Sequence, residues 1–351
     1  MNVSVIIPAY NAAGTIVDTL ESLRTQTFTT WEAIVVDDGS VDKTLTIAKH
    51  FAQCDHRICV MSQPHAGHSA ARNTALHHAR FDWLVFLDAD DWILPIHLAC
   101  LTQTLAANSD LDAVHCGWTQ VQSDGMPGSP KYCSQSGDLF DLFARYCAFA
   151  MNACLVRRAL VQAAGGFDVQ MQTCGDWDMW QRVARLGARF GAIHQVLARH
   201  RMRPNSVSVN SIQLLRDALT VITHGHSSDT RVSNAHPCHA NGMPTEQLAH
   251  AKLLFATWVA GLEIGRGKDA RPCLALLKDD HAPMLEPASV AASIFQAALL
   301  PRCKIESDWV TLLPKWQLQI DLFLDALELQ SQANGLAQRS RYTLEQLIKM
   351  K

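Results

Sequence analysis

The sequence lacks the features that mark several common classes of protein. Its 351 residues contain no C-x-x-C pair, and the 11 cysteines are scattered and odd in number, which argues against a disulfide framework. No apolar stretch reaches the length of a membrane span, and the nearest, residues 288–300, is interrupted by polar side chains. The first residues do not form a signal peptide. We therefore expect a cytoplasmic protein whose only membrane contact would be peripheral, at the inner face.

Strong charge and glycine-rich phosphate loops are also missing. The net charge is −3, which gives no electrostatic case for nucleic acid as a partner. Neither G-x-G-x-x-G nor G-x-x-x-x-G-K-[ST] occurs, so any bound phosphate must be held by other groups.

An acidic cluster is the most informative feature that is present. The apolar run Trp83–Leu87 leads directly into Asp88, Asp90 and Asp91. Such a run is typical of a buried strand in a parallel sheet, and open α/β sheets bind ligands at the carboxyl ends of their strands. Three neighbouring carboxylates favour a hard cation such as Mg²⁺ or Mn²⁺. The alternative is a solvated turn that caps the next helix.

The pattern before this cluster predicts alternating strands and helices. Strands are expected at 3–7, 31–36, 57–61 and 83–87, with the first ended by Pro8, and helices at 15–25, 42–51 and 67–79. This order predicts a doubly wound, mostly parallel α/β sheet. Three strand ends then place Tyr10, Asp38 and Asp88 at one edge. Stacking by Tyr10, hydrogen bonding by Asp38 and the charge of Arg72 favour a nucleotide, although each residue also fits a purely structural role.

Four segments resemble the inverting family 2 glycosyltransferases with the GT-A fold. They are Val3 to Asn11, Val35 to Ser40 (with Asp42 and Thr44), Ala70 to Asn73, and Leu87 to Asp91. The resemblance runs from residue 3 to about 210. It implies that a sugar nucleotide, with UDP favoured, is bound by the residues Pro8, Ala9, Tyr10, Asp38, Arg72, Asp88 and Ala89. It also implies that Asp90 binds Mn²⁺ or Mg²⁺ at the diphosphate.

The segment that begins at Cys174 resembles the part of the family that carries the catalytic base. Asp176 stands at the matching position, and a carboxylate there would take the proton of an acceptor hydroxyl. Without the resemblance, Asp176 reads more simply as a helix N-cap. Trp177, Asp178 and Trp180 follow as candidate acceptor contacts, and the two tryptophans fit a helix core equally well.

Two departures from the family pattern concern this region. Gly175 replaces the usual Glu before the base, and Arg203 stands where a His often completes the metal site. Arginine cannot ligate a cation, but it pairs with a diphosphate. His200, three residues earlier, is an alternative metal ligand.

A loop is expected at 123–137, and helices at 95–107, 139–150 and 158–164, with a strand at 113–121.

The last 140 residues lie beyond the resemblance. Residues 224–245 are polar and read as a linker; their histidines and Cys238 fit no standard zinc spacing. Helices are expected at 247–264, 270–278, 288–300, 310–329 and 341–349. We predict a sugar-nucleotide half (1–120), an acceptor half (121–222), a linker (223–245) and an all-helical part (246–351) that holds the acceptor, dimerises or binds a partner.

The sequence therefore supports one main function and two alternatives. The main one is a metal-dependent inverting transfer of a hexose or N-acetylhexosamine from a nucleoside diphosphate sugar to a hydroxyl acceptor, as in polysaccharide, glycolipid or glycopeptide synthesis. The first alternative is a glycosyltransferase-like scaffold with weak catalysis whose helical part binds a partner. The second is a nucleotidyltransferase, which would normally carry the glycine-rich loop that is missing here.

Overall fold

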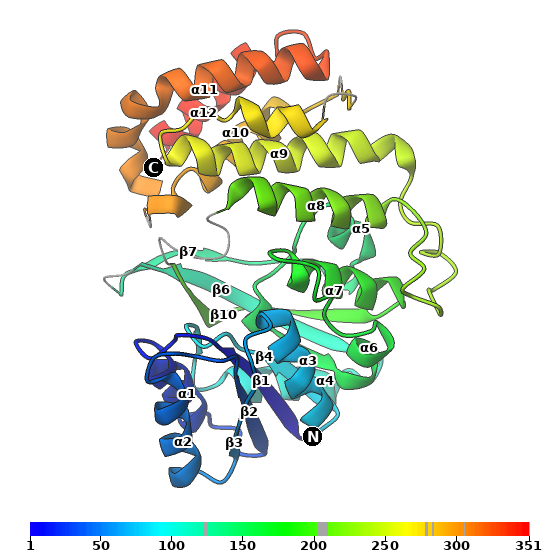
Figure 1. Ribbon diagram of the computed structural model, residues 1–351. Helices are drawn as coiled ribbons and strands as arrows, with labels where there is room; N and C mark the ends of the chain where they lie inside the picture. Colours follow the sequence, from blue (N-terminus) through cyan, green and yellow to red (C-terminus); the bar gives the residue numbers. More distant parts are fainter. Residues whose placement is uncertain are drawn as a thin grey trace.

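The computed structural model describes residues 1–122, 125–202, 210–277, 280–282, 284–302, 304 and 306–350. It combines a mixed sheet flanked by helices with a helical C-terminal part, which lies at the top of Figure 1. This confirms the predicted α/β class with an added helical region.

The first half of the sheet is parallel, as predicted. Its strands are adjacent in the order β3-β2-β1-β4 and all run in one direction. The strands are β1 (Val3–Ala9), β2 (Trp31–Asp37), β3 (Ile58–Ser62) and β4 (Trp83–Phe86). The helices between them are α1 (Ile16–Arg24), α2 (Thr44–Cys54) and α3 (His68–His78).

The prediction that Pro8 ends the first strand is wrong, because β1 continues to Ala9. The Ile6 carbonyl accepts from the Leu87 N–H, so alternate residues of β1 direct their backbone groups toward β4. Pairing of β1 with β4 ends at Ile6 and Phe86. Pro8 therefore lies where that ladder has already stopped, and its missing N–H breaks no sheet hydrogen bond.

The second half of the sheet was only partly predicted. β9 (Cys154–Arg157) is antiparallel to both β4 and β6 (Ala113–Val121), and the long β10 (Arg189–Arg201) runs parallel to β6. Neither β9 nor β10 was predicted as a strand. The expected loop 123–137 contains β7 (Pro127–Lys131), which pairs with β6, and the expected helix 139–150 shortens to α5 (Phe140–Phe143). The two short strands β5 (Trp92–Ile93) and β8 (Gly137–Asp138) pair with β10.

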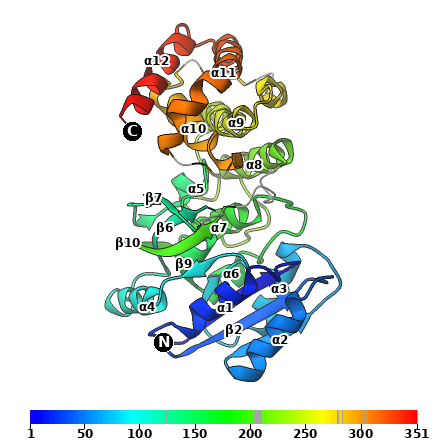
Figure 2. The same ribbon diagram turned by 90° about the vertical axis from the view of Figure 1, so that its left-hand side faces the viewer.

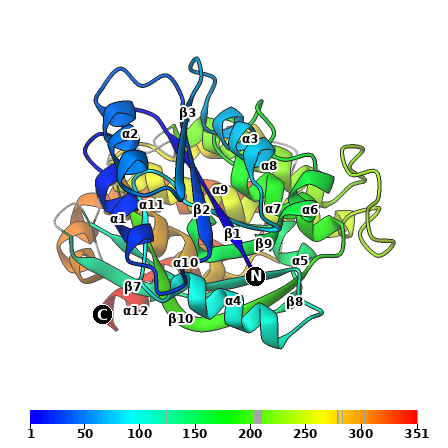
Figure 3. The same ribbon diagram turned by 90° about the horizontal axis from the view of Figure 1, so that it is seen from below.

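Helices cover both faces of the sheet, as the view from below shows (Figure 3). One face packs against α1, α2 and α4 (His97–Ala107), around a buried cluster that includes Val5, Leu20 and Leu101. The other face packs against α3, α6 (Arg158–Ala163) and α7 (Gly175–Arg185). The carboxyl ends of β1, β2 and β4 are left open between these layers, which is where a ligand can enter.

The helical part lies against α7, and the two views in Figures 1 and 2 agree on this. Its elements are α8 (Ser211–Gly225), α9 (Leu248–Gly265), the 3-10 segment η4 (Arg271–Leu277), α10 (Pro287–Ala297), α11 (Trp309–Ser331) and α12 (Leu336–Lys349). Residues 226–244, all of them described, contain no helix or strand. The Trp177 ring lies 5.1 Å from that of Phe255 in α9. None of the helices in the described part of the chain is long and apolar enough to cross a membrane.

Candidate active site

One cavity of about 620 Å³ lies at the carboxyl ends of the parallel strands. This volume is typical of sites for small molecules and cofactors. The predicted donor-binding and metal-binding residues and the predicted base meet there, apart from Arg203, which lies outside the described residues. The predicted residues that line the cavity are Pro8, Ala9, Tyr10, Asp38, Arg72, Asp88, Ala89, Asp90 and Asp176.

Tyr10 follows β1 and has an exposed ring, but one face of that ring is already covered. The His65 imidazole stacks on it, with ring centroids 4.2 Å apart and an interplanar angle of 25°. His65 is itself held by Asp38, with Nδ1 2.9 Å from Oδ2. The aromatic surface here is therefore a stacked tyrosine and histidine pair, not a single tyrosine ring.

Asp38 directly follows β2 and is buried, with four donors from its own chain. Its Oδ1 accepts from Gln63 Nε2 at 2.7 Å and from the Ala66 N–H at 3.0 Å, while Oδ2 accepts from the Gly67 N–H at 2.8 Å. The fourth donor is His65. These four contacts hold the 63–67 segment against the end of β2. A carboxylate has about four acceptor positions, so the predicted contact between Asp38 and a base would have to displace one of these donors.

Gly39 allows this segment to approach the strand end. Its φ is +73°, and an added Cβ would lie 2.8 Å from the backbone nitrogen of His65. Any other residue would be strained by the positive φ and would push the segment away. The shape of this wall of the cavity therefore depends on a glycine directly after Asp38.

Arg72 and Asp88 form a short ion pair on the floor of the cavity. Arg72 Nη2 lies 2.6 Å from Asp88 Oδ1, and the guanidinium also lies over the Phe167 ring at 5.2 Å. Burial raises the pKa of Asp88, but the charge and the hydrogen bond of Arg72 outweigh it, so the pKa is below its usual value. Asp88 is therefore a carboxylate at neutral pH, and Arg72 supplies a fixed positive charge next to it.

The end of β10 joins the loop that follows β4. Arg201 donates from Nε to the Asp90 carbonyl at 2.8 Å, and its backbone N–H donates to Asp91 Oδ1 at 2.8 Å. His200 Nδ1 lies 3.3 Å from Asp91 Oδ2. The negative charge of Asp91 raises the pKa of His200 to about 9. His200 also lines the cavity, so it stays a candidate for the alternative metal ligand.

The carboxylates of the cavity fit a cation that is completed by substrate. Within the described ranges, no three His, Cys, Asp or Glu side chains gather closely enough to hold a metal by themselves. Mg²⁺ and Mn²⁺ prefer oxygen ligands, and Mg²⁺ is usually bound by one or two carboxylates together with substrate phosphates. Asp90 on the cavity wall, with Asp88 two positions earlier, supplies such a donor set.

Asp176 lies in the first turn of α7. Its Oδ1 accepts from the Trp177 N–H at 2.8 Å, so the carboxylate is held by the start of its own helix. The same residue also lines the cavity. The structure thus brings the predicted base into the same space as the predicted donor residues, which are about 90 to 170 positions away in the chain.

The expectation that Trp177, Asp178 and Trp180 contact an acceptor is wrong, because all three are buried. The Trp177 indole donates to the Phe143 carbonyl at 2.7 Å, and Trp180 packs edge-on against Phe86 and Phe149. α7 packs against α5, α6 and α8, and Asp176 is its one residue that is not buried.

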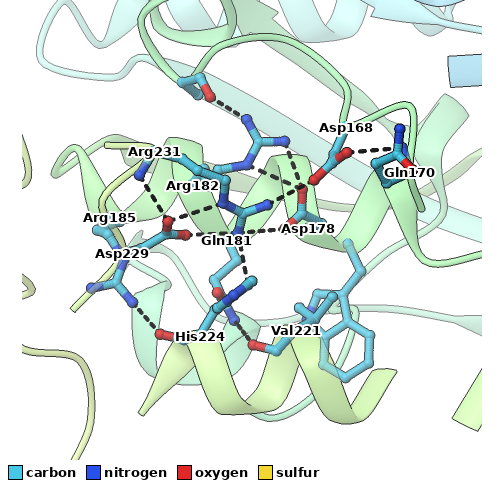
Figure 4. Close-up of polar contacts among 12 residues, drawn as sticks. Asp168, Gln170, Asp178, Gln181, Arg182, Arg185, Val221, His224, Asp229 and Arg231 are labelled. Atoms are coloured by element: carbon cyan, nitrogen blue, oxygen red, sulfur yellow. Dashed lines mark hydrogen bonds and ion pairs between the residues drawn. The ribbon is translucent and has the colours of Figure 1, made fainter. Parts of the chain in front are cut away.

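Asp178 instead belongs to a network of charges behind the site (Figure 4). Its Oδ2 accepts from Arg182 Nη2 at 2.7 Å, and its Oδ1 lies 2.9 Å from Arg231 Nη2. Arg231 also pairs with Asp168 and Asp229. Residues 226–244, predicted as a linker, are therefore fastened to α7. Their histidines have separate partners, for example Asp138 for His239 and the Ile222 carbonyl for His226, and they do not converge on one point.

The sequence reasoning missed several residues that line the cavity, namely His65, His68, Thr173 and Arg201. His65 and Thr173 carry no local signal. His68, however, precedes Arg72 by four positions in a predicted helix, so the two share one face of that helix. That spacing was a usable signal.

Comparisons with known proteins show a similarity to glycosyltransferases. Residues 4–151 match the family described as Glycosyl transferase family 2. The chain is 37% identical over 124 residues to glycosyltransferase GlyA of Streptococcus pneumoniae, covering 35% of this chain and 18% of GlyA. It is 41% identical over 113 residues to the uncharacterized glycosyltransferase YibD of Escherichia coli K12, covering 32% of this chain and 33% of YibD. The matches thus span a third or less of these relatives.

Solved structures share the fold over nearly the whole chain. Staphylococcus aureus TarS 1-349 has a TM-score of 0.57 at 15% identity, covering 100% of this chain and 92% of that one. The mannosyltransferase PcManGT from Pyrobaculum calidifontis has a TM-score of 0.55 at 20% identity, covering 94% and 87% of the two chains. At such identities the likeness concerns the fold, and for TarS its span includes the helical part.

Proposed function

Residues 4–151 of this chain form a glycosyltransferase family 2 domain, and we propose that the protein transfers a sugar from a nucleoside diphosphate sugar to a hydroxyl group with inversion. The observation that carries this proposal is the single cavity shared by Arg72, Asp88, Asp90 and Asp176. A positive charge, two carboxylates for a cation and a further carboxylate from α7 are groups that such a transfer can use.

The chain's own residues can divide the reaction between two sides of the cavity. Asp176 takes the proton from the acceptor hydroxyl as its oxygen bonds to the anomeric carbon. The bond from that carbon to the diphosphate breaks on the opposite side, and the diphosphate leaves with the bonding electrons. Arg72 places positive charge near that leaving group. Asp90, together with Asp88, would hold Mn²⁺ or Mg²⁺, which supplies further neutralisation of the diphosphate when bound.

We infer UDP as the donor nucleotide, with a hexose or an N-acetylhexosamine as the transferred sugar. TarS 1-349 has been solved with UDP and with UDP-GlcNAc. PcManGT has been solved with GDP-Man and Mn²⁺, which makes GDP the competing base. The acceptor hydroxyl would enter beside Asp176, because the other residues of α7 are buried.

A thermal shift panel tests this proposal. UDP, GDP, UDP-GlcNAc, UDP-Glc and GDP-Man would each be added with and without Mn²⁺ to the wild type and to Asp90→Ala. A ligand at 100 times its Kd adds about 2.7 kcal/mol of stability, which raises the melting temperature visibly. We expect UDP and its sugars to stabilise the wild type with Mn²⁺ and the variant to lose the effect. If no nucleotide changes the melting temperature, the enzyme proposal fails and the scaffold alternative takes its place.

A further inference from the structure

His68 occupies a place in the cavity that the mechanism leaves unassigned. In an inverting transfer the attacking oxygen and the leaving diphosphate lie on opposite sides of the anomeric carbon. The transferred sugar must therefore lie between the groups at the diphosphate and the base. Resting on the proposed function, this locates the sugar between Arg72 with Asp88 on one side and Asp176 on the other.

The helix α3 crosses this interval. Arg72 and His68 are four residues apart and lie on one face of α3, which begins at His68. Arg72 pairs with Asp88, while His68 lies one turn closer to the N-terminus and toward α7. The His68 Nε2 is 3.9 Å from the position that a Cβ on Gly175 would take, directly before Asp176. Both His68 and Asp176 line the cavity.

Gly175 lies close to two residues at the start of α3. An added Cβ would also lie 3.0 Å from the Ser69 hydroxyl oxygen, which is tighter than most real contacts. The residue before the base therefore contributes no side chain, and the Ser69 hydroxyl and the His68 imidazole are the polar groups nearest to the position that its Cβ would take. Of these two residues, only His68 lines the cavity. The absence of a side chain at Gly175 and the presence of a histidine at 68 are two parts of one local arrangement.

The chemistry of His68 suits a sugar. Burial and the neighbouring Arg72 lower its pKa, against the opposing charges of Asp88, Asp176 and Asp38, so the ring is neutral at physiological pH. A neutral imidazole carries one donor and one acceptor, and it can bond to a hydroxyl or to the carbonyl of an acetamido group. It places no extra charge beside the base.

We propose that His68 contacts the transferred sugar and helps to select which sugar is accepted. If His68 contacts the sugar and not the nucleotide, its replacement should alter only the preference between sugar nucleotides. Variants of His68 should bind UDP as the wild type does and should differ in how they discriminate between UDP-GlcNAc and UDP-Glc.

The test measures the Kd of UDP, UDP-GlcNAc and UDP-Glc by calorimetry with Mn²⁺, for the wild type, His68→Ala and His68→Gln. The matched control is His77→Ala, because His77 lies exposed at the other end of the same helix. We expect UDP affinity within about twofold throughout. One lost neutral hydrogen bond should change the ratio of the two sugar-nucleotide Kd values by about 3- to 10-fold in His68→Ala, with partial recovery in His68→Gln.

Each outcome decides the question. Equal weakening of UDP and both sugar nucleotides would move His68 to the nucleotide site and overturn the proposal. An unchanged ratio would overturn it as well, while leaving the proposed function intact. If the wild type binds no nucleotide, the proposed function fails first and this inference falls with it. Should His68→Ala prove unfolded by circular dichroism, the comparison rests on His68→Gln.

Discussion

Arg231 and Asp178 form an ion pair that fastens an irregular segment to the helix of the proposed base. Arg231 Nη2 lies 2.9 Å from Asp178 Oδ1, and the Asp178 side chain has no exposed surface. Asp178 follows Asp176 by two positions in the first turn of α7. The position of this turn, and with it the direction of the Asp176 carboxylate, therefore depends on a residue some fifty positions later in the chain.

Replacement of Arg231 by Ala should destabilise the protein. It removes one of the two cations that neutralise the buried carboxylate of Asp178. Arg231 is itself 29% exposed, so we expect a loss of roughly 1–3 kcal/mol in the free energy of unfolding, below the usual value for a fully buried pair. Urea denaturation measures this. The control is Arg189→Ala, whose ion pair with Asp110 is 59% exposed on both sides and should change stability by about 0.5 kcal/mol or less. Equal losses of stability in the two variants would show that the buried ion pair contributes no more than the exposed one.

Replacement of Asp176 by Asn should abolish most transfer while leaving nucleotide binding intact. The amide keeps the shape of the side chain but cannot take the proton from the acceptor hydroxyl. We expect kcat to fall by a factor of about 10² to 10⁴, with the Kd of UDP within twofold of the wild type. Asp82→Asn, on a side chain that is 83% exposed, serves as the control. Retention of kcat within tenfold in Asp176→Asn would assign the base to another group.

Replacement of Asp38 by Asn should loosen the 63–67 segment. The new amide nitrogen cannot accept from a backbone N–H, so at least one of the bonds from Ala66 and Gly67 is lost. We expect about 1–3 kcal/mol less stability and a weaker affinity for UDP, because the Tyr10 and His65 pair would lose its support. Calorimetry and denaturation should show both effects. A stable variant with lost UDP affinity would instead favour a direct contact between Asp38 and the base.

The buried histidines predict a pH dependence of stability. Burial lowers the pKa of His97 to about 4, below the value of 6.5 in an unfolded chain. Between these values the unfolded chain binds a proton that the native protein does not, so the free energy of unfolding falls as the pH drops from 6.5 toward 4. Below pH 4 this contribution stops changing.

The corresponding measurement compares urea denaturation of the wild type and His97→Gln between pH 4 and 8. The contribution of one such histidine is about 1.4 kcal/mol per pH unit. Near pH 5, the free energy of unfolding of the variant should change with pH less steeply than that of the wild type, by roughly that amount. Above pH 7 the two proteins should show the same dependence on pH. Parallel curves throughout the range would mean that His97 titrates normally in the native protein.

The parallel half of the fold could be predicted because its signals are local. Each apolar run ends at a polar turn, and each helix shows a 3.6-residue period. β10 was missed because this 13-residue strand is rich in charged and half-exposed residues, and its register shifts twice between Ile193 and Ala198. β9 has only four residues, Cys154–Arg157, which is too short for a period to emerge.

The site shows the same division between local and distant information. Tyr10, Asp38, Asp88 and Asp90 could be predicted to meet because they follow neighbouring strands, and the family resemblance added Asp176. The acceptor role of Trp177 and Trp180 failed because burial of α7 depends on residues distant in the chain, such as Phe86 and Phe149 before it and Phe255 after it. The stacking of His65 on Tyr10 depends on the four donors around Asp38, which no periodicity reveals.

The buried cluster that runs from Ile6 in β1 through Trp180 in α7 to Phe295 in α10 and Leu344 in α12 has a consequence for how the molecule can be divided. This cluster contains residues from elements both before and after the irregular segment 226–244, so the sheet and the helical part share one core. They should therefore unfold in one cooperative transition. A fragment cut within that segment would expose the apolar sides of α7 and α8 to water. Such a fragment should aggregate, although the cut itself falls in a polar stretch that looks, in the sequence, like a natural place to divide the chain.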